Sequence, residues 1–84
     1  MDSKHHKILL AIFEKLEKAN IAWRDIEALL IALGAEILEG KGSRMRVALN
    51  GVRAVFHRPH LRKETNKGAI KSVRRLLEAA GVKP

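Results

Sequence analysis

The feature that most constrains the fold is an alternation of apolar and polar residues on both sides of Asn50-Gly51. An Asn-Gly pair is typical of a two-residue β-hairpin turn, because both turn positions need a positive φ angle. Residues 44–49 and 52–57 then pair, and every second side chain points to the same face of the hairpin. One face is apolar and carries Met45, Val47, Leu49, Val52, Ala54 and Phe56, whereas the other carries Arg44, Arg46, Ala48, Arg53, Val55 and His57.

The length and composition narrow the class of protein. A chain of 84 residues is expected to form a single domain with one modest core. The chain has no cysteine, which removes disulfides and thiolate metal sites and fits a reducing compartment, so we expect a cytoplasmic protein. No targeting signal is visible and the apolar runs are too short to span a bilayer, so no membrane association is expected.

The net charge of +8 is unevenly distributed along the chain. Residues 1–40 contain five Lys/Arg and seven Asp/Glu, a net charge of −2, whereas residues 41–84 contain twelve Lys/Arg and two Asp/Glu, a net charge of +10. Such segregation favours a polyanionic partner, and nucleic acid is the first choice because neutralised phosphates release counterions. The alternative is a basic surface that only keeps the protein soluble.

Apolar periodicity predicts two helices before the hairpin and one after it. The first helix takes in residues 4–18, and the second ends at Gly34, which is placed to adopt a left-handed cap. Residues 35–39 are predicted to form a short strand, and Thr65 or Asn66 caps the last helix. The expected fold is therefore α+β, in the order α-α-β-β-β-α, with one face of a three-stranded antiparallel sheet packed on helices and the other face free.

Histidine is the side chain best suited to acid–base chemistry in this chain. Residues 41–84 hold only Glu64 and Glu78, so no carboxylate-bound magnesium site is expected, and phosphodiester cleavage would proceed without metal or other cofactor. His57 is the best-placed base, because it shares the basic face with Arg44, which lies opposite and disfavours the charged imidazole. In RNA this base would activate a 2′-hydroxyl for attack on the adjacent phosphate, with His60 as the weaker candidate for a second proton transfer.

Both histidines also have a purely structural interpretation. His57 would then merely end a strand, and His60 would pack against Pro59 or hydrogen-bond the loop. Adjacent His5 and His6 lie on different sides of a helix and have no second ligand pair, so no metal site is expected. Phosphate contacts are expected from basic residues of the hairpin, its flanks and the last helix, where a solvated surface is the alternative: Lys41, Arg44, Arg46, Arg53, Arg58 and Lys71.

Several short motifs occur together in the second half of the chain, namely Gly42-Ser43, Asn50-Gly51, Arg58-Pro59-His60, Lys67-Gly68 and Lys71-Ser72-Val73. In their order and spacing they resemble the HicA toxins of bacterial toxin–antitoxin pairs. The resemblance implies a fold like the double-stranded RNA-binding domain, metal-independent cleavage of mRNA, and neutralisation by a HicB antitoxin whose complex sets the oligomeric state. We therefore expect one HicA-like domain over residues 1–84, with residues 1–20 as an extra N-terminal helix and residues 21–84 as the family core.

The chain departs from the family pattern at one important position. HicA toxins usually carry their catalytic histidine directly after the Gly-Ser turn, whereas here Arg44 follows Ser43. Because Arg44 is expected opposite His57, we hypothesise that His57 reaches the same patch from the neighbouring strand. The leading interpretation is an RNA-cleaving toxin with His57 as general base. The alternatives are a non-catalytic RNA-binding module and a basic domain that docks an acidic protein partner.

Overall fold

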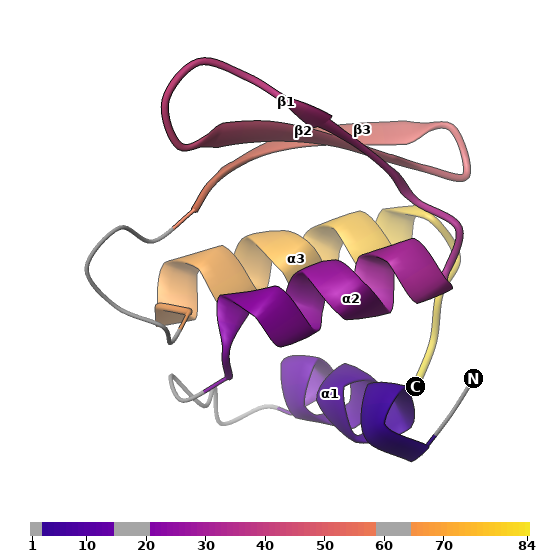
Figure 1. Ribbon diagram of the computed structural model, residues 1–84. Helices are drawn as coiled ribbons and strands as arrows, with labels where there is room; N and C mark the ends of the chain where they lie inside the picture. Colours follow the sequence, from indigo (N-terminus) through magenta and orange to yellow (C-terminus); the bar gives the residue numbers. More distant parts are fainter. Residues whose placement is uncertain (1–2, 15–20, 59–64) are drawn as a thin grey trace.

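The computed structural model describes residues 3–14, 21–58 and 65–84. The elements are, in order, α1 (Ser3–Phe13), α2 (Trp23–Ala32), β1 (Glu36–Glu39), β2 (Arg44–Leu49), β3 (Val52–His57) and α3 (Lys67–Ala79). They stack in layers, with the sheet on one side, α2 and α3 in the middle, and α1 beneath them (Figure 1). The expected α+β fold and element order are confirmed, and the arrangement is consistent with a double-stranded-RNA-binding-domain-like fold. The predicted first helix is confirmed as far as Phe13, and residues 15–18 of that prediction lie outside the described residues.

The hairpin has the predicted register. β2 and β3 pair antiparallel, with Leu49 opposite Val52 next to the turn and Arg44 opposite His57 at the far end. Asn50 and Gly51 have φ angles of 51° and 81°, the positive values that a two-residue turn of this type requires. β1 pairs antiparallel with the other side of β2, which gives the sheet order β1-β2-β3.

The ends of the helices explain where the elements begin and stop. Gly34 has a φ angle of 93°, and backbone hydrogen bonds from Gly34 N to Ile31 O and from Ala35 N to Leu30 O close the end of α2. The side chain of Asn66 accepts a hydrogen bond from Ala69 N at 2.8 Å, so Asn66 caps α3. These caps confirm the predicted helix boundaries on either side of the sheet.

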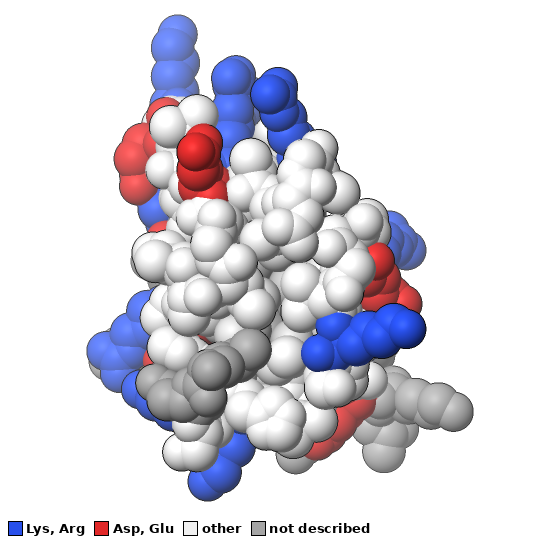
Figure 2. All heavy atoms as spheres, turned by 90° about the vertical axis from the view of Figure 1, so that its right-hand side faces the viewer, with Lys and Arg blue, Asp and Glu red and all other residues white. Residues whose placement is uncertain are grey.

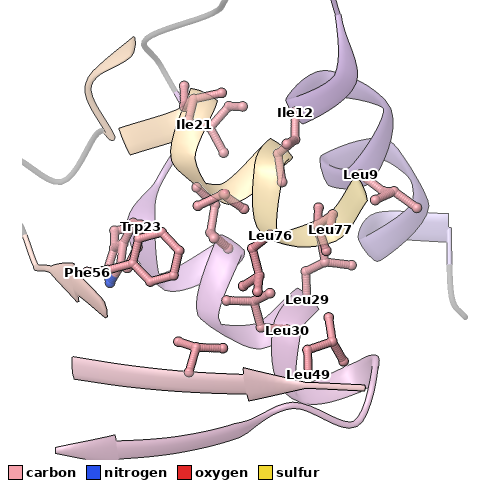
Figure 3. Packing of buried hydrophobic residues seen from close by; sticks show 14 of the residues in the cluster. Leu9, Ile12, Ile21, Trp23, Leu29, Leu30, Leu49, Phe56, Leu76 and Leu77 are labelled. Atoms are coloured by element: carbon pink, nitrogen blue, oxygen red, sulfur yellow. The ribbon is translucent and has the colours of Figure 1, made fainter. Parts of the chain in front are cut away.

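The core lies between the sheet and the helices. The apolar face of the sheet packs against α2 and α3, with Met45, Val47 and Leu49 buried and Val52 and Ala54 partly buried. The rings of Trp23 and Phe56 lie 5.8 Å apart with an interplanar angle of 56°, which joins the start of α2 to the end of β3 (Figure 3). Since one face of the sheet is buried in this way, the opposite face is left to solvent.

The first helix is fastened to the middle layer by apolar and polar contacts. Leu9 and Ile12 are buried in the common core (Figure 3). Arg74 of α3 donates hydrogen bonds to the carbonyl oxygens of Ile12, at 2.8 Å, and Glu14, at 2.9 Å. The last carbonyls of a helix lack intrahelical partners, so Arg74 both satisfies the end of α1 and holds it against α3. Within the described residues, no helix is long and apolar enough to cross a membrane.

Candidate functional site

The candidate site lies on the outer face, which we define as the sheet surface turned away from the helices. Strand parity and register place eight residues there: Glu36 and Leu38 from β1, Arg44, Arg46 and Ala48 from β2, and Arg53, Val55 and His57 from β3. A shallow depression of about 500 Å³ crosses its centre. Basic side chains project at the top of the molecule, where the sheet lies in Figure 1, and acidic side chains stand near them (Figure 2). The outer face is therefore cationic, with an acidic margin contributed by β1.

Arg44 and His57 form a directly opposed pair on this face, as the sequence predicted. The backbone N–H of Arg58 donates to Ser43 O at 2.9 Å, so Ser43 and Arg58, the pair next to Arg44 and His57, are hydrogen-bonded. Because the two kinds of pair alternate, Arg44 and His57 form a non-hydrogen-bonded pair, in which Cα atoms are about 4.5 Å apart and side chains are closest. Both side chains are exposed, so the imidazole and the guanidinium are available to the same ligand.

Gly40 leaves room for the side chain of Arg44. Its backbone N–H donates to Arg44 O at 2.8 Å, which brings the turn before β2 against the start of that strand. A Cβ atom at Gly40 would lie only 3.3 Å from the Cβ of Arg44. Glycine here therefore keeps the side of Arg44 that faces away from His57 uncovered.

Arg46 and Arg53 lie at different distances from the histidine. Arg46 is the diagonal neighbour of His57, a relationship that corresponds to about 7–8 Å in antiparallel sheets. Leu38 and Val55 flank Arg46 on the neighbouring strands and are 62% and 53% exposed. Arg53 is four residues from His57 along β3, or about 13 Å at the usual strand rise. The cations closest to His57 on the outer face are therefore Arg44 and Arg46.

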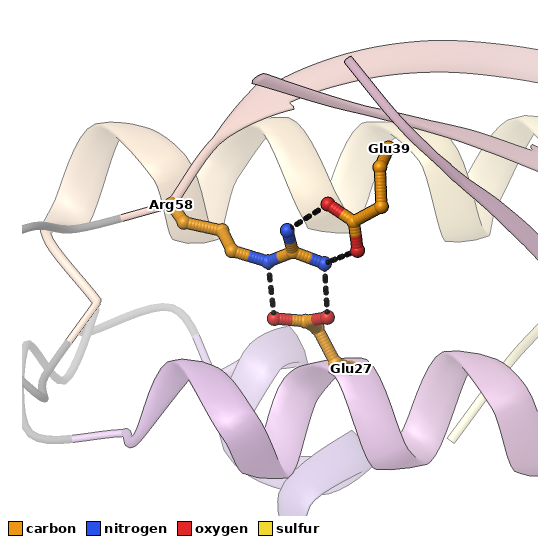
Figure 4. Close-up of polar contacts among 3 residues, drawn as sticks. All are labelled: Glu27, Glu39 and Arg58. Carbon is orange, nitrogen blue, oxygen red and sulfur yellow. Dashed lines mark hydrogen bonds and ion pairs between the residues drawn. The ribbon is translucent and has the colours of Figure 1, made fainter. Parts of the chain in front are cut away.

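Arg58 has a different environment, which we call the Arg58 clamp: Arg58 with Glu27 of α2 and Glu39 of β1. Its Nε and Nη2 atoms donate to the two carboxylate oxygens of Glu27 at 3.0 and 2.9 Å. The guanidinium also binds both oxygens of Glu39, through Nη2 at 2.7 Å and through Nη1 (Figure 4). Two planar bidentate contacts of this kind fix position as well as charge. The clamp ties the end of β3, next to His57, to α2 and to β1.

The clamp changes the proton affinity of Glu39 and Arg58. Hydrogen bonds from Arg58, with its positive charge, hold the pKa of the Glu39 carboxyl below its ordinary value. The bonds to Glu39 and then to Glu27 raise the pKa of the Arg58 guanidinium, which therefore stays charged. The charge of Arg58 is balanced by these two carboxylates within the domain. The expected contact of Arg58 with phosphate stays a prediction.

The remaining residues predicted for the site are dispersed. Lys41 is exposed in the turn that precedes β2. Lys71 is exposed on α3, in the layer below the sheet, so it does not join the outer face. His60 lies outside the described residues. The fold thus brings together Arg44, Arg46, Arg53 and His57 and leaves Lys71 apart from them.

Two features of this region were not predicted from the sequence. The pairing of Arg58 with Glu27 and Glu39 joins residues that are 31 and 19 positions apart, and no local pattern indicates it. The exposed Leu38 does have a signal, since Ile37 and Leu38 are consecutive in a strand and only one of them can face the core. Among the described residues, no group of three or more His, Cys, Asp or Glu is arranged to hold a metal ion.

Comparison with known proteins identifies the family. Searches of curated proteins and of solved structures found no significant match. A family model described as the HicA toxin of bacterial toxin-antitoxin matches residues 23–82. The match begins at the first residue of α2 and includes the whole sheet, the Arg58 clamp and α3, while α1 precedes it. Because it covers well over half of the 84 residues, the chain belongs to the HicA toxin family of bacterial toxin–antitoxin systems.

Proposed function

We propose that this HicA-family toxin is a metal-independent ribonuclease that acts on mRNA, and that His57 is its general base. The observation that carries the proposal is the exposed pair of His57 and Arg44 on the cationic outer face. An imidazole can take up and release a proton near neutral pH, and a guanidinium beside it can bind a phosphate. Together they would supply a base for the 2′-hydroxyl and a cation for the attacked phosphate.

In the proposed reaction, neutral His57 removes the proton of a 2′-hydroxyl as the 2′-oxygen attacks the adjacent phosphorus. The bond from phosphorus to the 5′-oxygen of the next nucleotide breaks, and that oxygen takes up a proton, for which His60 is the proposed donor. The products are a 2′,3′-cyclic phosphate and a 5′-hydroxyl. Since the RNA itself provides the nucleophile, the step needs neither a metal-activated water nor a covalent enzyme intermediate.

The arginines would act on the phosphate and on the rest of the RNA. Arg44 and Arg46 are near enough to His57 to stabilise the charge that develops on the oxygens of the attacked phosphate. Arg53, farther along β3, and Lys41, in the turn, would bind phosphates of neighbouring nucleotides. Lys71 would contact only RNA that continues past the sheet. Arg58 would have to leave both glutamates to bind RNA, so we assign it a structural role.

Membership of the family implies a HicB antitoxin as partner. We propose that the antitoxin covers the outer face and thereby blocks access to His57. Two large apolar side chains, Leu38 and Val55, are exposed there among the arginines, which is typical of a surface that a protein partner buries. We place both proteins in the cytoplasm, where mRNA is available, with the oligomeric state set by their complex.

The test is incubation of the purified domain with RNA in the presence of EDTA, followed by analysis of the cut ends. The proposal expects cleavage that chelation does not reduce, with 2′,3′-cyclic phosphate ends. A matched RNA that carries a single 2′-deoxynucleotide at the cleavage site should resist cutting there. Cleavage that EDTA abolishes, or that proceeds at the deoxy position, would contradict the mechanism.

One observation favours a second candidate function, a non-catalytic RNA-binding module. Arg44 occupies the position after the Gly-Ser turn where toxins of this family usually carry a histidine. This alternative predicts RNA binding that weakens steeply with salt and no cleavage under any condition. Arg46→Ala and Arg53→Ala should each reduce the slope of log affinity against log salt by about one.

A further inference from the structure

β3 has one edge that is free for pairing. β2 lies on one side of β3, and in the part of the chain that the structure describes no strand pairs with its other side. The hydrogen bond from Arg58 N to Ser43 O fixes which residues of β3 bond to β2. By alternation, the backbone N–H and C=O groups of Arg53, Val55 and His57 point toward the free edge. An open edge of this kind is a template for another strand.

A groove of about 350 Å³ runs beside this edge, between β3 and α3. Its lining includes apolar side chains of both elements, Val52, Ala54, Phe56, Leu76 and Ala79. Two arginines, Arg53 of β3 and Arg75 of α3, also line it, and both are exposed. The edge of β3 is therefore bordered by an apolar groove with a cationic rim.

We propose that an extended, acidic polypeptide segment binds here as a fourth strand beside β3. Its backbone would pair with the free groups of Arg53, Val55 and His57, and every second side chain would enter the groove. β3 has six residues, so a segment of about the same length fills the edge. The side chains that enter the groove would be small or β-branched apolar ones over Ala54 and Ala79, and the alternate side chains would be acidic and lie near Arg53.

The chemistry of the groove favours this occupant over two others. A second copy of the chain has a net charge of +8 and would bring a second set of these arginines to the edge, with like-charge repulsion. RNA could bind the arginines, but its backbone cannot continue the ladder of N–H and C=O groups, and its phosphates have no partner in an apolar groove. The proposal concerns a surface beside the outer face and does not depend on ribonuclease activity.

The test uses synthetic octapeptides and the full chain at low salt. The probe alternates Glu and Val, and a matched control alternates Lys and Val. We expect the acidic peptide to bind and to slow amide hydrogen exchange at Arg53, Val55 and His57, without a comparable change at Val52 and Ala54, which already bond to β2. No binding at millimolar peptide, equal binding of the two peptides, or protection at other residues would overturn the proposal. If these three amides are already protected without peptide and the protein has the mass of a dimer, the proposal is overturned in favour of self-association.

Three variants sharpen the test. Val55→Pro removes the one N–H that points to the free edge at this position and leaves the bonds to β2 in place, so it should weaken acidic peptide binding roughly tenfold or more. Val55→Ala keeps the N–H and should bind nearly as well as the wild type. Arg53→Glu, an exposed change on the outer side of β3, should reduce the preference for the acidic over the basic peptide. Unchanged preference in a folded Arg53→Glu variant would contradict the proposed charge complementarity.

Discussion

Arg44 and His57 face each other across the two strands of the hairpin, and both side chains are open to solvent. The arrangement follows from the turn at Asn50-Gly51, because a two-residue turn leaves only one register for the strands behind it. The proposed base and the proposed phosphate-binding cation are thus held together by backbone geometry rather than by a loop. The pairing makes the roles of individual arginines on the outer face separable by experiment.

Arg44→Ala should lower the rate of RNA cleavage far more than Arg53→Ala does. Arg44 is next to His57 and is placed to bind the attacked phosphate, so its loss should reduce kcat about 100-fold. Arg53 is farther along β3, and its loss should mainly weaken RNA binding. Cleavage rates measured at saturating and at limiting RNA separate the two effects. An equal loss of kcat in both variants would show that proximity to His57 does not matter.

Arg58→Ala should lower the free energy of unfolding by roughly 1–3 kcal/mol, since it leaves the partly buried Glu27 carboxylate without its bidentate donor. Chemical denaturation measures this change, and Arg53→Ala, an exposed arginine on the same strand, is the control that should change stability little. A double-mutant cycle of Arg58→Ala with Glu27→Ala isolates their coupling. If Arg58→Ala proves as neutral as Arg53→Ala, the clamp has no structural role.

The clamp also predicts a dependence of stability on pH. Arg58 holds the pKa of Glu39 below the ordinary carboxyl value of 4.5, so ionisation of Glu39 stabilises the folded state. This contribution is complete above the unfolded-state pKa and is lost as the pH falls through the lower, folded-state pKa. The difference in unfolding free energy between wild type and Glu39→Gln should therefore shrink as the pH is lowered from 7 to below 4.5, the ordinary carboxyl pKa. The difference will be small at any pH, because the Glu39 side chain is 66% exposed. A difference that widens in acid would contradict the lowered pKa of Glu39.

Arg74→Lys should loosen α1, whereas Arg75→Lys on the next position should not. Arg74 spans two carbonyl oxygens at the end of α1 with separate donors, a geometry that a single ammonium does not reproduce. We expect a loss of about 1 kcal/mol in unfolding free energy and faster amide exchange in α1. Hydrogen exchange measured residue by residue gives both quantities. Equal exchange in the two variants would mean that apolar packing of Leu9 and Ile12 alone holds the helix.

The sheet was predictable from the sequence because its signals are local. Alternation around Asn50-Gly51 fixed the hairpin, its register and the identity of the two faces, and Gly34 and Asn66 marked helix ends through their own backbone chemistry. The opposition of Arg44 and His57 follows from the same local pattern. These features need no knowledge of how distant elements pack.

The Arg58 clamp could not be predicted, because it depends on where α2 and β1 lie relative to the end of β3. Arg58 has the same local sequence signature as the other basic residues near the hairpin, and only the packed fold brings Glu27 and Glu39 to it. The attachment of Arg74 to the end of α1 is nonlocal in the same way, since it joins residues about 60 positions apart. For charged residues, local sequence pattern indicates exposure but does not distinguish an internal partner from an external one.

The most direct test of the central claim compares RNA cleavage in EDTA by wild type, His57→Ala and His6→Ala. His6 is an exposed histidine on α1, away from the outer face, and its replacement should leave the rate unchanged. Loss of the proposed general base should reduce the cleavage rate of His57→Ala by about 10²–10⁴-fold relative to wild type. Added imidazole should restore part of the activity of His57→Ala, since a small base can enter the open site. Cleavage at the wild-type rate by folded His57→Ala would contradict the assignment of His57 as the base.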